Sequence, residues 1–296
     1  MNANSNAQYS QPLLVDVFNH QRFKGSYYLT GFVAKLDENK QPFWVITLSD
    51  ATGYLQMYCR DHTCIADNLQ PQSLVDVEAS IDCRGKEPYF RCKLIQASSI
   101  DLSRPKRLSQ LPVALCNKPK ALTALLEIVD SLTEPLLIEF AMNVLTQPQV
   151  GLQYIQCPAS ANHHHNYAGG LLEHSVEVAT QLKNELDTNS QECDLAIVGA
   201  LLHDIGKTQT FTSDGKRSAI GYLIDHNDLT LEICAPALKI LQAKHAGLAN
   251  SLRHAWTCAS EGSRYGFKAK TPVARLLKEV DRKSAANAIK AINAFK

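Results

Sequence analysis

Four polar residues in the second half of the chain have types and positions that suit a metal ion. Eight of the ten histidines lie between positions 163 and 254. His174, His203 and Asp281 each fall on the apolar face of a predicted helix, and Asp204 directly follows His203. Burying an imidazole or a carboxylate on such a face costs free energy unless the side chain has a partner. The pattern therefore predicts that these side chains meet one another or a cation.

Two imidazoles and two carboxylates from three helices could coordinate one divalent ion and leave positions open for water and substrate oxygens. Mixed nitrogen and oxygen ligands favour manganese, iron, nickel or cobalt over calcium, and magnesium is also compatible. Such an ion lowers the pKa of a bound water and stabilises charge on a phosphoryl oxygen, which is how these sites hydrolyse phosphoesters. The alternative for each residue taken alone is a hydrogen-bonded core histidine or a buried salt bridge.

The same residues carry a family resemblance. His174, then LLHDIGK with His203 and Asp204, then Asp281 form a series that resembles the H…HD…D signature of HD-domain metal-dependent phosphohydrolases. The segment CPASANHHHNYAGGLLEHSVEVA is similar to the sequence that enters the first metal histidine of YhaM-type 3′-to-5′ exoribonucleases. Its HHH and GGLLEHS parts also resemble HD modules of MobH-type conjugative relaxases. The resemblance implies an OB-fold before the HD domain and a nucleic-acid substrate.

The sequence departs from this family pattern at one place. Many two-metal HD enzymes have a histidine pair after a motif that here reads HAWTCASEG, and this chain has Ala259 and Ser260 at those positions. His226 matches a family histidine that helps to bind the second ion, and His254 lies near enough in sequence to compensate. We expect one tightly bound ion rather than two.

Several basic side chains near the four residues could contact a phosphate. Lys207 follows His203 by four residues on the same helical face and could meet a substrate phosphate, or it could simply favour the helix C-terminus. His163, His164 and His165 precede the first metal helix and could hold the scissile phosphate or protonate a leaving oxygen. The alternative for these three is a polar loop with a capping histidine. Residues 264–296 contain nine Lys or Arg and two acidic residues.

The elements that must position these groups differ between the two halves of the chain. Twelve of the 21 aromatic residues lie in the first hundred positions, where the composition is strand-like. Three strands, one short helix over residues 61–69 and two more strands form the order of an OB-fold barrel. The expected strands cover residues 26–35, 43–49, 54–59, 73–83 and 89–97.

Surface aromatic and basic side chains on this barrel could bind single-stranded nucleic acid. The barrel has more aromatic residues than a small interior holds easily, so some should stack on bases, although for any single one a core position is the alternative. Basic residues on the later strands could follow a phosphate backbone, or they could line a solvated face. The candidates are Tyr28, Trp44, Tyr54, Tyr58, Arg60 and Arg91.

Periodicity turns helical after a proline-rich stretch. The fold class is therefore α+β with two domains: an OB-fold barrel over residues 10–100, a linker over 101–120 and an all-α HD domain over 121–296. The expected helices start at residue 121, with an interruption at Pro135, and continue over residues 170–186, 194–205, 229–245, 248–259 and 271–294. In the last of these, Thr271 can cap the helix and Pro272 suits its first position.

Composition limits the partners and the location. The net charge of +1 gives no global attraction to polyanions, so contacts with nucleic acid must come from local patches. Nine scattered cysteines without a CxxC pair indicate reduced thiols and exclude a zinc ribbon. No apolar run approaches the roughly 20 residues of a transmembrane helix, and the N-terminus has no signal-peptide pattern. We expect a cytoplasmic protein without membrane contact, and a homo-oligomer is compatible with the sequence.

Together these features predict a metal-dependent phosphodiesterase that binds single-stranded RNA or DNA through its barrel and cleaves from a 3′ end. The RNA preference and the end polarity come from the resemblance alone. In this hypothesis Asp204 also orients the attacking water, and Lys207, His164 and His165 act on the phosphate. The alternatives are a phosphohydrolase of small nucleotides, with the barrel used for assembly or regulation, and a non-catalytic single-strand-binding protein with a decayed HD site.

Overall fold

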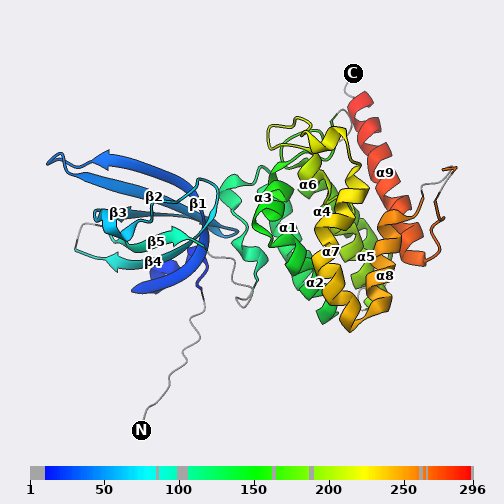
Figure 1. Cartoon of the computed structure of the whole chain (residues 1–296), viewed down its shortest axis with the longest axis horizontal. Coiled ribbons are helices and arrows are strands. Elements are labelled where there is room, and N and C mark those ends of the chain that lie inside the picture. Colours follow the sequence, from blue (N-terminus) through cyan, green and yellow to red (C-terminus); the bar gives the residue numbers. More distant parts are fainter. Residues whose placement is uncertain are drawn as a thin grey trace, which may run out of the picture. The chain divides into compact units, whose positions relative to one another are not determined.

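The computed structural model describes residues 11–84, 87–98, 106–161, 165–186, 190–259, 263–264 and 266–294, with the side chains of residues 285–294 excepted. Contacts divide the chain into two compact units, residues 1–115 and 116–296 (Figure 1). The first unit is a β-barrel and the second is built from helices, so the predicted fold class is confirmed.

Five strands close into a barrel in the order β1-β2-β3-β5-β4. The pairs are antiparallel except for β3 and β5, which run parallel and close the barrel between Met57–Tyr58 and Phe90–Arg91. Each of the five predicted strands is present within a few residues of its expected bounds. The strands are β1 (Arg22–Leu36), β2 (Pro42–Asp50), β3 (Gly53–Cys59), β4 (Leu74–Asp82) and β5 (Tyr89–Ala97) (Figure 1).

Alternation along the strands fills the barrel interior. Met57 on β3 and Val75 on β4 are fully buried, whereas their neighbours in sequence are more exposed. A 3₁₀ helix that periodicity does not predict, η1 (Leu14–Asn19), places Val17 in the same core. The backbone N–H of Leu14 donates to the buried carboxylate of Asp50 at 2.8 Å, which fixes η1 to the end of β2.

Two expectations for this unit need correction. The helix expected over residues 61–69 is a single 3₁₀ turn, η2 (His62–Cys64), because the Asp61 side chain accepts from the backbone N–H of Thr63 and closes the turn locally. The described part of the expected linker, residues 106–115, packs on the barrel through η3 (Leu108–Gln110) and η4 (Val113–Leu115). Leu108 is 2% exposed, so burial of its side chain holds this segment in place.

The second unit is helical throughout its regular structure. Short helices α3 and α6 are not separated by the periodicity, whereas the longer helices lie close to their expected ranges. The helices are α1 (Pro119–Asp130), α2 (Pro135–Leu145), α3 (Pro148–Gln156), α4 (Gly170–Glu185), α5 (Gln191–Leu202), α6 (Lys207–Thr210), η5 (Ile220–Tyr222), α7 (His226–Lys244), α8 (Ala246–Thr257) and α9 (Pro272–Ala294) (Figure 1).

α5 is the central helix of this unit. Every residue of α5 from Cys193 onward is buried, and α4, α8 and α9 all pack against it. α9 begins as predicted, with Pro272 at its first position and the Thr271 hydroxyl accepting from the backbone N–H of Ala274 at 3.2 Å. α4, α5 and α9 therefore meet in one place. None of the described helices is long and apolar enough to cross a bilayer.

Candidate metal centre

The first histidine of interest stands one turn into α4. Gly169 adopts a left-handed backbone with φ of 78°, and α4 starts at the next residue. A Cβ atom on Gly170 would lie 2.1 Å from the carbonyl oxygen of His165, so only glycine allows the preceding loop to pass this close. His174 follows on the buried face of α4 and is 1% exposed.

The second histidine stands at the C-terminus of α5, where the last carbonyls of the helix need donors from outside. Trp256 of α8 donates its indole N–H to the Gly199 carbonyl at 2.9 Å, and the Tyr154 hydroxyl of α3 donates to the Leu201 carbonyl at the same distance. Both donors are buried. These two hydrogen bonds fix the turn that contains His203 and Asp204.

The third element is α9, which contributes Asp281. Its Oδ1 lies 3.2 Å from His174 Nε2 and 3.6 Å from His203 Nε2. Asp204 Oδ2 lies 3.7 Å from His174 Nε2 and 3.4 Å from His203 Nε2. The structure thus brings together the four residues that the sequence singles out, and we call them the His/Asp cluster. Three of them, His174, His203 and Asp281, have ligand atoms close enough to one another to hold one ion.

The state of His203 supports a fit to a metal ion. Its Nδ1 lies 2.7 Å from the Ala200 carbonyl oxygen, which can only accept, so Nδ1 carries a proton. Its Nε2 is buried and has no hydrogen-bond partner among the residues that the structure describes. In the neutral ring this nitrogen presents a lone pair toward two carboxylates, which is repulsive unless a proton or a cation lies between them.

The pKa values show how strongly these groups interact. Burial disfavours a charged His203, but the carboxylates of Asp204 and Asp281 outweigh burial and raise the pKa of His203 to about 9. Burial opposes ionisation of both carboxyl groups as well. The charges of His203 and Lys207 near Asp204, and hydrogen bonds from His174 and His203 together with the charge of His203 near Asp281, nevertheless hold both carboxyl pKa values well below their usual range. The cluster is therefore a set of ionised carboxylates facing imidazoles.

Two further predicted residues lie on the Asp204 side of the cluster. Lys207 Nζ is 2.5 Å from Asp204 Oδ2, so in this structure the ammonium pairs with the carboxylate. His226, the first residue of α7, places Nε2 3.2 Å from Asp204 Oδ1. A Cβ atom on Gly206 would lie 1.9 Å from the His226 carbonyl oxygen, so this glycine allows α7 to pack against the turn.

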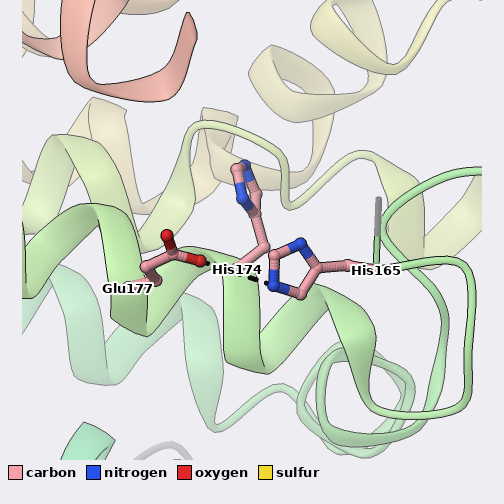
Figure 2. Close-up of side chains that lie close together, drawn as sticks. All are labelled: His165, His174 and Glu177. Atoms are coloured by element: carbon pink, nitrogen blue, oxygen red, sulfur yellow. Dashed lines mark ion pairs between the residues drawn. The ribbon is translucent and has the colours of Figure 1, made fainter. Parts of the chain in front are cut away.

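His165 lies on another side of His174. Figure 2 shows its ring directed toward the carboxylate of Glu177, which projects from the same helix as His174. The His165 Nε2 to Glu177 Oε2 distance is 3.4 Å, and the His165 and His174 ring centroids are 5.4 Å apart. These three residues form a second group with metal-binding geometry. His163 and His164 lie outside the described residues.

Other residues that support the site escape sequence reasoning. Ser284 is buried on α9, with its hydroxyl 3.4 Å from His174 Nδ1. Tyr154 and Trp256 read as ordinary core residues, because nothing local indicates that they cap another helix. Only Glu177 carries a local signal, since it stands three residues after His174 on one helix face.

His254 does not join the His/Asp cluster. Its Nε2 accepts from the backbone N–H of Lys270 at 2.8 Å, so this ring holds the segment before α9 instead of facing an ion. This corrects its assignment as a replacement ligand for a second metal. Ala259 is half-buried and Ser260 lies outside the described residues.

The nucleic-acid candidates on the barrel divide by exposure. Tyr28 is 4% exposed, and burial raises the pKa of its hydroxyl to about 12, so it belongs to the core and offers no stacking surface. This corrects its assignment as a base-contacting residue. Tyr54 is 70% exposed. Trp44 is half-buried and lines a pocket of about 310 Å³. Its ring packs edge-on against His62, with the two ring centroids 5.3 Å apart.

Tyr58, Arg60 and Arg91 line one pocket of about 250 Å³ on the β3 and β5 face. Tyr58 pairs with Arg91 across the parallel strands, and the Tyr58 ring also packs against Tyr89. Arg60 pairs with Asp37 at 2.5 Å but keeps a side chain that is 60% exposed. An aromatic ring between two basic side chains is an arrangement that suits a base and its phosphate.

Comparison with known proteins shows similarity to the HD domain and to two exoribonucleases. The HD domain model matches residues 171–286. The chain is 28% identical over 194 residues to the 3′-5′ exoribonuclease YhaM of Oceanobacillus iheyensis, which covers 60% of this chain and 58% of that protein. It is 23% identical over 208 residues to YhaM of Bacillus licheniformis, covering 69% of this chain and 65% of that protein.

A different activity is named for another relative. The dihydroneopterin 2′,3′-cyclic phosphate phosphodiesterase of Methanocaldococcus jannaschii is 35% identical over 96 residues, which cover 29% of this chain and 38% of that protein. The chain spans about three fifths of the length of the YhaM relatives that it matches. The chain is therefore similar to YhaM proteins and to the HD domain, as the sequence motifs predict.

Proposed function

Starting from an HD domain match that contains the His/Asp cluster, we propose that this chain is a metal-dependent phosphodiesterase that acts on single-stranded nucleic acid, as a 3′-to-5′ exoribonuclease. One observation carries the proposal. Two imidazoles and two ionised carboxylates from α4, the turn after α5, and α9 converge within 3.2 to 3.7 Å inside the matched region.

His174, His203, Asp204 and Asp281 would hold the ion. A divalent metal in such a site supplies Lewis-acid stabilisation of a phosphoryl oxygen and activates water. The buried Asp204 is held ionised beside Lys207 and can orient the attacking water through its second oxygen. Lys207 and His226, both next to Asp204, can bind the oxygens of the scissile phosphate.

His165 is suited to a proton-transfer role in the same proposal. Glu177 holds the His165 ring beside His174 (Figure 2), so its imidazole is oriented before substrate arrives. A ring in this place could protonate a leaving oxygen. On the barrel, Tyr54, Tyr58, Arg60 and Arg91 would contact the bases and phosphates of the single strand.

The test is a time course on 5′-labelled single-stranded RNA and DNA with manganese present, for the wild type and for Asp204→Asn. Asp204→Asn keeps the shape of the side chain and removes its charge. The matched control is Asp228→Asn, an exposed aspartate on the first turn of α7 that pairs with no residue of the cluster among those described. Metal content is measured on all three proteins.

We expect a ladder that shortens from the 3′ end for the wild type and the control, and at least a hundredfold slower cleavage for Asp204→Asn with less bound metal. Cleavage by Asp204→Asn at the wild-type rate would contradict the role of the cluster. Metal-loaded wild type that cleaves no oligonucleotide would contradict the nuclease proposal.

The second candidate function is hydrolysis of small nucleotides or cyclic phosphates. The relative named as a cyclic phosphate phosphodiesterase favours it, because that similarity lies at the highest identity among the three relatives described above. Turnover of 2′,3′-cyclic or cyclic dinucleotide substrates without turnover of oligonucleotides would establish it. Binding of a single strand without any turnover, under each divalent metal tried, would instead indicate a binding protein with a decayed site.

A further inference from the structure

A cleft of about 910 Å³ opens beside the His/Asp cluster, between α9 and the segment that precedes it. Asp281 lines this cleft and is also the cluster carboxylate that lies 3.2 Å from His174. Its side chain is 38% exposed, whereas that of Asp204 is 7% exposed, so the cluster is open on the Asp281 side. We call this space the α9 cleft.

The charged side chains that line the α9 cleft are mostly basic. Two acidic residues also line it, but Glu279 pairs with Lys283 at 2.8 Å and Asp281 faces the two histidines. The chain as a whole has a net charge of only +1, so this is a local concentration of positive charge. The five cations are Arg264, Lys268, Arg275, Lys278 and Arg282.

Three of these cations are held in a row by α9. Arg275, Lys278 and Arg282 have spacings of three and four, which put them on one helix face. The opposite face is fixed in the core, since Ala274 and Val280 are fully buried. At 1.5 Å per residue the row extends over about 10 Å, which is longer than the contact surface of one phosphate group.

The other wall is also fixed. The backbone N–H of Ala259 donates to the Phe267 carbonyl at 2.8 Å, and Ala259 and Lys268 form a β-bridge. His254 holds the same segment through the Lys270 N–H. A Cβ atom on Gly266 would lie 3.1 Å from the Ala259 methyl, so these two segments of the chain are in close contact there. The basic side chains of both walls therefore project from anchored backbone.

We propose that the α9 cleft binds the sugar-phosphate backbone of a single-stranded oligonucleotide, with the row of cations contacting consecutive phosphates upstream of the linkage at the His/Asp cluster. This inference rests on the proposed function. It identifies the α9 cleft as the part of the protein that would favour an oligonucleotide over a mononucleotide. One phosphate is already provided for by Lys207 and His226 on the Asp204 side. A mononucleotide has no further backbone phosphates that could contact the additional cations beyond Asp281.

The test measures binding of a fluorescein-labelled single strand of about a dozen nucleotides to the full-length, metal-loaded protein. Its linkages are phosphorothioates, which retain the charge and resist hydrolysis, and its length is checked after each titration. The cleft variant is Arg275→Gln/Lys278→Gln. The matched control is Lys120→Gln/Lys239→Gln, which removes the same charge from exposed positions on α1 and α7 that do not line the cleft. Thermal melting confirms that all proteins are folded.

The slope of log affinity against log salt reports the number of phosphates contacted. For a single strand each contact contributes about 0.7, so we expect the slope of the cleft variant to be shallower by about 1.4 and its affinity at low salt to be at least tenfold weaker. The control is expected to keep the wild-type slope. Equal slopes for the wild type and the cleft variant would overturn the proposal, and so would an equal loss in the control.

Two further measurements complete the test. Displacement of the oligonucleotide by inorganic tripolyphosphate at the same phosphate concentration would show a general polyphosphate site and overturn the assignment to a nucleic-acid backbone. Cleavage assays with unmodified RNA separate the two proposals. Wild-type cleavage combined with an unchanged slope in the cleft variant refutes the cleft alone, whereas a changed slope without any cleavage refutes the nuclease proposal alone.

Discussion

At the scale of the residue, His203 has two nitrogens with different tasks. Nδ1 donates to the Ala200 carbonyl and fixes the ring, while Nε2 faces Asp204 and Asp281 without a hydrogen-bond partner in the described chain. Without an ion, the two carboxylates favour a protonated ring, and this raises the pKa of His203 to about 9. A metal ion at the cluster must therefore displace that proton.

We predict that divalent metal affinity increases about tenfold per pH unit from pH 7.5 to 8.5, because one proton leaves His203 for each ion bound below its pKa of about 9. In the metal-free protein, the stability of the fold changes with pH in the opposite direction. The raised pKa stabilises the fold fully below about pH 6.5, and that contribution is lost as the pH rises through about 9. Calorimetric titration with Mn²⁺ at several pH values measures the first effect, and an affinity that does not change with pH would contradict it.

A second residue-scale prediction concerns two glycines. A methyl group on Gly206 would lie 1.9 Å from the His226 carbonyl oxygen, whereas one on Gly199 in α5 would meet its nearest neighbour, Leu277, at 3.8 Å. Gly206→Ala should lower the free energy of unfolding by about 1–3 kcal/mol through forced displacement of α7. Gly199→Ala should change it by less than about 1 kcal/mol, in the stabilising direction. Urea unfolding compares them, and equal stabilities would refute the close contact.

At the scale of the element, two helix ends of the helical unit are completed by side chains from other helices. Asp194 on α5 is 1% exposed, and its Oδ2 accepts from the backbone N–H groups of Thr133 and Glu134, each at 2.7 Å. These groups lie at the N-terminus of α2. The same arrangement recurs at the C-terminus of α5, where Trp256 and Tyr154 are the donors. Both of these helix ends are thereby tied to neighbouring helices.

Asp194→Ala should therefore lower the free energy of unfolding by about 1–3 kcal/mol, because it removes the buried, charged acceptor of two backbone N–H groups at the α2 terminus. Glu192→Ala, at an exposed position on the first turn of the same helix, is the control and should change stability by less than about 0.5 kcal/mol. Chemical denaturation measures both. A loss for Asp194→Ala no larger than that of the control would show that the α2 terminus is satisfied in another way.

At the scale of the whole molecule, the chain has two units with separate cores. The barrel core includes Val17, Met57 and Val75, and the helical unit is organised around α5. The His/Asp cluster and the α9 cleft lie entirely within residues 116–296. In the proposed function, metal binding would therefore require only the helical unit, while capture of a long single strand would use both units.

We predict that a fragment of residues 116–296 folds by itself and binds Mn²⁺ with an affinity within about twofold of the full chain, because all cluster ligands and their supporting side chains are present. Its affinity for a long single strand should fall at least tenfold, since the surface around Tyr58 and Arg91 is absent. Calorimetry and fluorescence anisotropy measure the two affinities. A fragment that binds the strand as well as the full chain would contradict a role for the barrel.

The sequence by itself determined the two halves, the strands and long helices, and the four residues of the His/Asp cluster. Alternation and helical periodicity are local signals of burial, and a carboxylate or an imidazole on an apolar stripe is visible without coordinates. The HD motif and His174 carried the family resemblance, which the match over residues 171–286 supports.

Only the tertiary structure decided which of the remaining polar residues belong to the site. Tyr28 and His254 have suitable residue types, but Tyr28 is buried and the His254 ring accepts a hydrogen bond from the Lys270 N–H. The pairing of His165 with Glu177 depends on the path of the loop before α4. The row of cations has a local helical spacing, but its place beside His174 and His203 depends on how α9 packs against α4 and α5. Such contacts depend on distances between segments far apart in the chain, and local residue patterns carry no information on those distances.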